Sequence, residues 1–140
     1  MKVAYFLSMF PCWSETFILR EMLELQRRGV ELTIFSLKPC NETLVHPDAA
    51  AIVAQGRVVY ASPRTSALRF AAAALRHPIK VAKLMWQFRS AYDGSFASLM
   101  KSYASMAIAA EWIPLMRERG IEHIHAPWGT YPSTAALFCS

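Results

Sequence analysis

Two short stretches of this 140-residue chain combine polar and aromatic side chains in a pattern that suits ligand binding. The first is residues 8–16, SMFPCWSET, and the second is residues 125–132, HAPWGTYP. Each follows a short apolar run that is typical of a buried strand. In an open parallel α/β sheet, ligands bind where strands end and helices begin, so both stretches are candidates for one site.

The first stretch has the chemistry of a helix start. Ser14 offers a hydroxyl N-cap, and Glu15 places a negative charge in the first turn of a helix that ends before Gly29. A helix N-terminus attracts phosphate, but Glu15 would repel that anion, so sugar hydroxyls suit this position better. No glycine lies between Leu7 and Arg28, which excludes both common glycine-rich phosphate loops and disfavours an NAD or ATP pocket. A capped loop without any ligand stays open as an interpretation.

The second stretch begins with a histidine at a predicted strand end. His123 and His125 share one face of that strand, and only His125 reaches the carboxyl end, where a ligand could meet it. A lone histidine there more often makes core or loop hydrogen bonds. Trp128 beside Gly129 can form a flat platform for a sugar or base, or can simply cover the end of the sheet. Neither His46 nor His77 has other metal-binding residues at ligand spacing in the sequence, so no metal site is predicted.

The elements that must position these residues alternate between strands and helices. Strands are predicted over residues 2–8, 30–37, 57–61 and 121–125. One helix is predicted from Ser14 to residue 28, and another begins at Pro132. Two or three helices are predicted within residues 66–119, and residues 38–55 are predicted to be a loop with at most one short helix. Pro114 is expected to kink or end its helix. The strand–helix–strand order of residues 2–37 predicts a right-handed crossover, and hence an α/β, Rossmann-like parallel sheet with helices on both faces.

Composition limits the class of protein. Hydrophobic residues make up 54% of the chain and charged residues 18%, which excludes a disordered or collagen-like protein and fits one domain over residues 1–140. Cys12, Cys40 and Cys139 are odd in number and widely spaced, so they indicate neither a disulfide framework nor a zinc site and favour a reducing cytosol. No secretion signal and no membrane-spanning stretch is predicted.

The middle of the chain is basic. The formal net charge is +5, and residues 57–89 interleave Lys and Arg with aromatic side chains such as Phe70 and Trp86. Such a segment could lie on an anionic membrane surface. A solvated helical face is the favoured interpretation, because Pro78 interrupts the sustained apolar face that an interfacial helix needs. No nucleic-acid-binding motif accompanies the charge.

Specific residues of both stretches resemble one enzyme family. The first part of the chain resembles the opening of family 4 glycosyltransferases of the exopolysaccharide and colanic-acid type. The residues that carry this resemblance are residues 2–5, Phe10-Pro11, residues 14–18 (SETFI) with Glu21, and residues 28–31 and 34–37. Residues 124–129 (IHAPWG), with Pro132 and residues 135–136, resemble the next marked stretch of that family. The resemblance covers both ends of the chain, and its FPxxSETFI pattern is the more specific part.

This resemblance implies the acceptor-side half of a GT-B enzyme, in which two Rossmann-like domains face each other across a cleft. A nucleotide-sugar donor would sit mainly on a second domain, and this half would bind a saccharide or lipid-linked acceptor in polysaccharide biosynthesis. The substrate-binding residues it implies are Phe10, Pro11, Ser14, Glu15, Thr16, His125, Trp128 and Gly129. No cofactor is predicted, no catalytic residue is assigned, and the expected location is the cytoplasm or the inner membrane surface.

In that family a further strand ends in a histidine-containing loop near the reacting sugar, and the donor-binding domain follows. Both would lie beyond Ser140, so we expect an N-terminal domain cut off within a helix, without its donor-binding domain. Alone it is expected to transfer no sugar and to form dimers or aggregates through exposed surface.

Two other interpretations remain. The chain could be a stand-alone Rossmann-like module that binds a ligand or partner without catalysis, although the missing glycine loop counts against a nucleotide. It could also be a flavodoxin-like regulatory domain, but that class would place acidic residues at the end of the first strand, where residues 7–9 (LSM) provide none.

Overall fold

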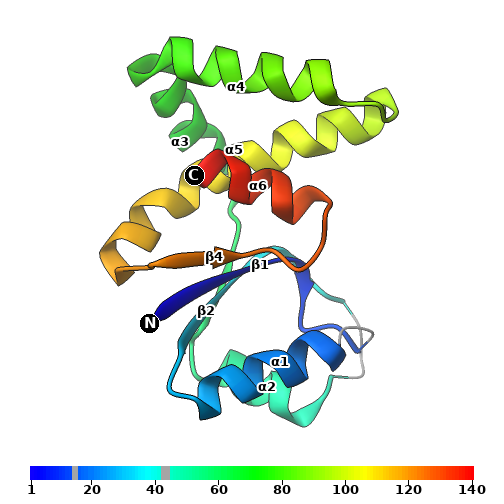
Figure 1. Cartoon of the computed structure of the whole chain (residues 1–140), viewed down its shortest axis with the longest axis vertical. Helices are drawn as coiled ribbons and strands as arrows, with labels where there is room; N and C mark the ends of the chain where they lie inside the picture. The colour runs from blue at the N-terminus through cyan, green and yellow to red at the C-terminus, as the bar shows by residue number, and fades with distance from the viewer. Residues whose placement is uncertain (14–15, 42–44) are drawn as a thin grey trace.

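The computed structural model of the chain describes residues 1–13, 16–41 and 45–140. It confirms an α/β, Rossmann-like fold built on a four-stranded, all-parallel sheet with the order β3-β2-β1-β4 (Figure 1). The strands are β1 (Lys2–Phe10), β2 (Glu31–Pro39), β3 (Val58–Tyr60) and β4 (His123–His125). The helices are α1 (Thr16–Arg27), α2 (Pro47–Ala54), α3 (Pro63–Arg76), α4 (Pro78–Ala91), α5 (Phe96–Arg119) and α6 (Tyr131–Cys139).

Helices cover both faces of the sheet, as the sequence predicts. Side chains alternate along β1, so that Val3, Tyr5 and Leu7 pack toward α1 and α2, whereas Ala4 and Phe6 pack toward α5 and α6. Most of β1 is buried from both sides, which explains its nearly continuous apolar sequence.

On the second face, the core is centred on Trp112 of α5, which is fully buried. Its ring centroid lies 5.0 Å from that of Phe6 and 5.2 Å from that of Phe35, so one indole joins α5 to both central strands. Its Nε1 has no hydrogen-bond partner among the described residues.

The boundaries of several elements differ from the sequence-based prediction. β1 was expected to end at Ser8, but Met9 and Phe10 pair with Lys38 and Pro39 of β2 and extend both strands. β4 is shorter than expected and begins only at His123. The extension of β1 beyond Ser8 could not be predicted from its own residues, because it depends on pairing with β2.

The predicted helical segment contains three helices, and Pro114 lies inside α5 rather than ending it. The helix continues because its remaining backbone groups still bond and its side chains pack into the core on either side of the proline. α5 begins at the N-cap Ser95, whose side chain accepts a hydrogen bond from the Ser98 N–H, and ends at Gly120 with φ +65°. Gly29, with φ +80°, ends α1 in the same way, as predicted.

The helices α3 and α4 form an outer layer beyond α5 (Figure 1). α3 packs on α5, and the backbone N–H of Ser62 and the hydroxyl of Ser66 both donate to the Glu111 carboxylate at 3.1 and 2.5 Å. α4 has no buried residue. Within residues 1–13, 16–41 and 45–140, no helix combines the length and apolar character needed to cross a membrane.

Candidate functional site

The order of the strands makes the boundary between β1 and β4 a topological switch point. From β1 the chain turns to α1, on one face of the sheet, whereas from β4 it turns to α6, on the other face (Figure 1). Such a switch point between neighbouring parallel strands is where ligands bind in open α/β sheets. The two stretches singled out in the sequence follow these two strands, so they lie at the same end of the sheet.

A carboxylate, a phenol and an imidazole meet beside this switch point. Tyr5 of β1 and His125 of β4 are register partners whose ring centroids lie 4.8 Å apart. The Tyr5 hydroxyl donates a 2.8 Å hydrogen bond to Oε1 of Glu21, and the His125 Nε2 lies 3.6 Å from the same oxygen. The side chains of His125 and Glu21 are 37% and 44% exposed, so this cluster is open to a ligand.

An aromatic contact joins α1 to the loop after β4. Phe17 of α1 and Trp128 of the loop after β4 meet edge to face, with ring centroids 5.4 Å apart. Phe17 is 54% and Trp128 39% exposed, so both still present apolar surface to solvent. The Ser133 hydroxyl donates to the Trp128 carbonyl and ties this loop to the first turn of α6. Because Phe17 lies one helical turn from Glu21, α1 presents both residues toward β4.

A hollow of about 320 Å³ lies beside α1, toward α2 and on the opposite side of the helix from Glu21. Thr16 lines it together with Trp13, whose ring centroid is 6.1 Å from that of His46. His46 serves as the N-cap of α2, with its Nδ1 accepting a 3.3 Å hydrogen bond from the Asp48 N–H. Thr16 and the Glu21 cluster therefore lie on different sides of one helix.

The structure brings together only part of the predicted set. His125 and Trp128 lie beside the switch point with Phe17 and Glu21, whereas Thr16 lines the hollow near α2. The placement of Phe10 in a loop was wrong: it is the last residue of β1, and its side chain is 3% exposed within the core. Its pairing with Pro39 keeps the chain extended to that point.

Pro11 and Gly129 follow β1 and β4 and lie at the same end of the sheet. Pro11 follows β1 and is half-buried, and Gly129 is exposed, with open space where a Cβ would stand. The predicted cap Ser14 and its neighbour Glu15 lie outside the described residues.

Sequence reasoning missed Tyr5 and did not single out Phe17 and Glu21 as site residues. Tyr5 sits inside an apolar strand, where its hydroxyl gives no pattern of its own. The i, i+4 spacing of Phe17 and Glu21 was the available signal, because it puts an aromatic ring and a carboxylate on one helix face. Their orientation toward His125 depends on the tertiary packing of α1.

Burial raises the pKa of Tyr5, and the hydrogen bond to Glu21 together with its negative charge raises it further. Because the unfolded tyrosine loses its proton near pH 10.0 while the folded one keeps it, unfolding is favoured as the pH rises through that value. In Tyr5→Phe, we expect the free energy of unfolding to fall less steeply above pH 10.0 than it does in the wild type. Urea unfolding at neutral and alkaline pH measures this difference. Tyr103→Phe is the control; equal alkaline sensitivity of wild type and Tyr5→Phe would contradict this assignment.

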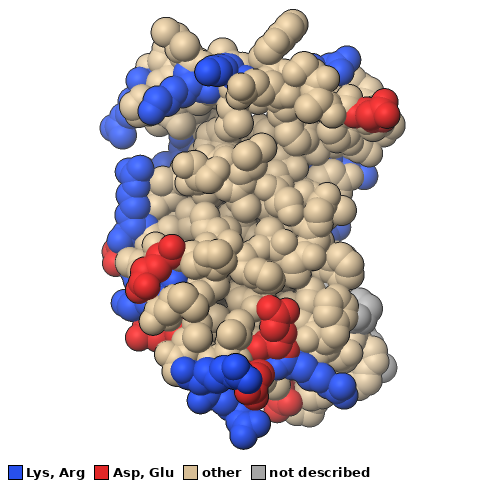
Figure 2. Space-filling view, viewed as in Figure 1, with Lys and Arg blue, Asp and Glu red and all other residues tan. Residues whose placement is uncertain are grey.

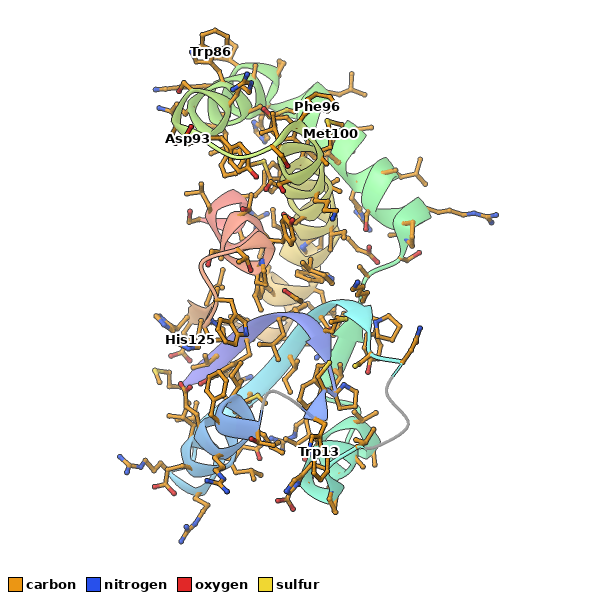
Figure 3. All side chains as sticks on the ribbon, turned by 90° about the vertical axis from the view of Figure 1, so that its right-hand side faces the viewer. Trp13, Trp86, Asp93, Phe96, Met100 and His125 are labelled. Carbon is orange, nitrogen blue, oxygen red and sulfur yellow. The ribbon has the colours of Figure 1, made fainter. Side chains whose placement is uncertain are left out.

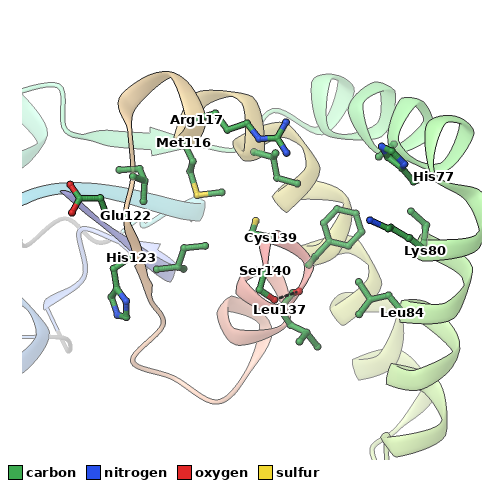
Figure 4. Close-up of a pocket in the computed structure, with 16 residues that line it drawn as sticks. His77, Lys80, Leu84, Met116, Arg117, Glu122, His123, Leu137, Cys139 and Ser140 are labelled. Atoms are coloured by element: carbon green, nitrogen blue, oxygen red, sulfur yellow. Dashed lines mark hydrogen bonds between the residues drawn. The ribbon is translucent and has the colours of Figure 1, made fainter. Parts of the chain in front are cut away.

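A larger cavity of about 650 Å³ lies away from this site, beside the open edge of β4 (Figure 4). It is bounded by α4, α5, α6 and β4, and its lining mixes apolar side chains with Lys80, Arg117 and His123. None of the predicted site residues lines it. Among the described residues, no group of three His, Cys, Asp or Glu side chains is placed to hold a metal ion.

Comparisons of this chain with protein-family models, with curated proteins and with solved structures found no match.

Proposed function

We propose that this chain is the acceptor-binding half of a glycosyltransferase, which holds a saccharide or lipid-linked acceptor while a second domain carries the nucleotide-sugar donor. The observation that supports this proposal is the Tyr5–Glu21–His125 cluster beside the exposed Phe17–Trp128 pair at the switch point of the sheet. A few convergent polar groups against aromatic surface are what a sugar-binding site requires.

The polar groups suit hydroxyl ligands. The second carboxylate oxygen of Glu21 makes no hydrogen bond within the described part of the chain, so it is available to accept from a sugar hydroxyl. His125 can donate or accept through Nδ1 while Nε2 faces Glu21. The faces of Phe17 and Trp128 that remain exposed can pack against the C–H side of a sugar ring.

A nucleotide fits this place less well. Glu21 would repel a diphosphate, and the segment after β1 has no glycine whose backbone could approach a phosphate. We therefore place the donor on another domain, in keeping with the resemblance of residues 10–18 to family 4 glycosyltransferases. Transfer requires donor and acceptor to be held together, and such placement accounts for roughly 7–11 kcal/mol of a reaction barrier.

The direct experiment is equilibrium binding by the purified chain to a panel of oligosaccharides and nucleotide sugars, followed by incubation of both together. The proposal expects saccharide binding and no sugar transfer by this chain alone. Binding of nucleotide sugars without saccharides would instead support a Rossmann-like nucleotide module. Turnover by a clean monomer, abolished in His125→Ala, would overturn the assignment of the chain to one half of the reaction.

We also propose that the α3–α4 layer contacts an anionic membrane surface, where a lipid-linked acceptor would be found. Residues 63–91 contain six Lys or Arg and no Asp or Glu, and Lys and Arg gather over this end of the molecule in Figure 2. Leu75, Ile79 and Trp86 are 83%, 82% and 73% exposed, and Trp86 points away from the body in Figure 3. Exposed apolar side chains among cations are typical of interfacial helices.

Removing two cations from this layer is expected to weaken vesicle binding. Each Lys or Arg near an anionic surface contributes about 1 kcal/mol, so Lys83→Gln with Arg89→Gln should weaken binding roughly thirtyfold at low salt. Sedimentation with phosphatidylglycerol–phosphatidylcholine vesicles measures this, and Arg27→Gln with Arg28→Gln at the opposite end is the matched control. No binding at low salt, or equal losses in both double variants, would favour a solvated helical face.

A further inference from the structure

Two cysteines that are far apart in sequence lie side by side at the carboxyl ends of β1 and β2. β1 and β2 are paired up to Phe10 and Pro39, and Cys12 and Cys40 follow within two residues of that last pair. Adjacent strands are about 4.8 Å apart, which lies within the range of Cα separations that a disulfide spans. The Cys12 thiol donates a hydrogen bond to the Cys40 sulfur, with the two sulfurs 2.6 Å apart.

The surroundings of this pair favour thiol chemistry over a structural role. Both cysteines are half-buried, so part of each side chain reaches solvent. Cys139 is half-buried as well, but desolvation against α5 raises the pKa of its thiol to about 12, which favours the protonated, less reactive form. No third His, Cys, Asp or Glu among the described residues joins the pair to make a metal site.

We propose that Cys12 and Cys40 form a reversible disulfide that links the ends of β1 and β2 when the chain meets an oxidant of the glutathione-disulfide class. The thiolate of one cysteine attacks one sulfur of glutathione disulfide, forming a mixed disulfide and releasing one glutathione thiolate. The thiolate of the other cysteine then attacks the protein sulfur of this mixed disulfide and releases the second glutathione. The two protein thiols lose two protons and two electrons, and one glutathione disulfide becomes two glutathione molecules.

Either cysteine can make the first attack, because the two sulfurs are in contact and both side chains are half-buried. The disulfide would close a loop between residues that are 28 positions apart. It would thereby restrain the segment containing Trp13, which lines the hollow beside α1. Oxidation is thus expected to rigidify one wall of that hollow.

The wild-type chain and the variants Cys12→Ser, Cys40→Ser and Cys139→Ser are incubated with glutathione disulfide, and intact and peptide masses are measured without reduction. Wild type and Cys139→Ser are expected to lose two hydrogens within one chain, with no glutathione attached. Cys12→Ser and Cys40→Ser should each retain one glutathione on the cysteine that remains of the pair. The oxidised wild type should melt about 5–10 °C higher than the reduced form, because the crosslink restrains the unfolded chain.

Hydrogen exchange at the backbone amides of residues 12, 13, 40 and 41 gives a second measurement that needs no variant, and oxidation should slow it. Stable glutathione on either cysteine of the wild-type pair, a crosslink between two chains, or equal reaction at Cys139 would overturn the proposal. Alkylating both thiols of the wild type before oxidation should abolish the mass loss and the melting shift together, even if a serine variant fails to fold.

Discussion

Trp112→Ala is expected to lower the free energy of unfolding by about 3–5 kcal/mol, the usual cost of deleting a large buried aromatic side chain. The indole is fully buried and contacts the rings of both Phe6 and Phe35, so its removal leaves a cavity between α5 and the two central strands. That loss is a large part of the stability of an ordinary domain. Urea unfolding followed by far-ultraviolet circular dichroism measures it.

Trp86→Ala is the matched control, because Trp86 is 73% exposed on α4 and its loss should change stability by no more than about 0.5 kcal/mol. Trp112→Phe should cost about half as much as the alanine variant, since it keeps much of the ring and removes an N–H that has no partner among the described residues. Equal effects of Trp112→Ala and Trp86→Ala would show that the second face of the sheet is not packed as described.

His125→Ala is expected to weaken saccharide binding by about ten- to a hundredfold, which corresponds to the ~1.5–3 kcal/mol of a hydrogen bond to a charged group. The reason is that His125 and Glu21 present adjacent, partly exposed polar groups beside the switch point. Glu21→Gln should have a comparable effect, because it removes the charge that faces His125 while keeping an oxygen for Tyr5. Titration calorimetry with the tightest saccharide of the panel measures both.

His123→Ala provides the control within the same strand. His123 lies two residues before His125, is exposed, and lines the cavity at the edge of β4. Its replacement should leave saccharide affinity unchanged. A larger loss in His123→Ala than in His125→Ala would move the binding site to that cavity.

Much of the fold could be predicted because its signals are local. The buried strand of residues 2–8, the glycines that end α1 and α5, and the strand–helix–strand order all depend on residues near one another in sequence. The extension of β1 to Phe10 could not be predicted, because it requires Lys38 and Pro39 as partners. The continuation of α5 through Pro114 likewise depends on packing around that helix.

The residues that meet at the candidate site could be predicted only in part, for the same reason. His125 and Trp128 were recognisable as polar and aromatic residues after a strand. Their partners Tyr5, Phe17 and Glu21 come from the middle of a strand and from a helix face, and only the parallel pairing of β1 with β4 joins them. The cysteine pair was missed in the same way, since a spacing of 28 residues becomes a contact only through the pairing of β1 with β2.

The central claim is that the switch point between β1 and β4 binds a saccharide. Its most direct test is a nuclear magnetic resonance titration of the isotopically labelled chain with the tightest-binding saccharide of the panel. The chemical-shift changes are then mapped onto the structure. The account predicts that the largest changes fall on Phe17, Glu21, His125 and Trp128, and that His125→Ala needs about ten- to a hundredfold more saccharide to reach the same changes. Changes centred on Lys80 and Arg117 in the β4-edge cavity, or no response to any saccharide alongside saturable binding of a nucleotide, would contradict it.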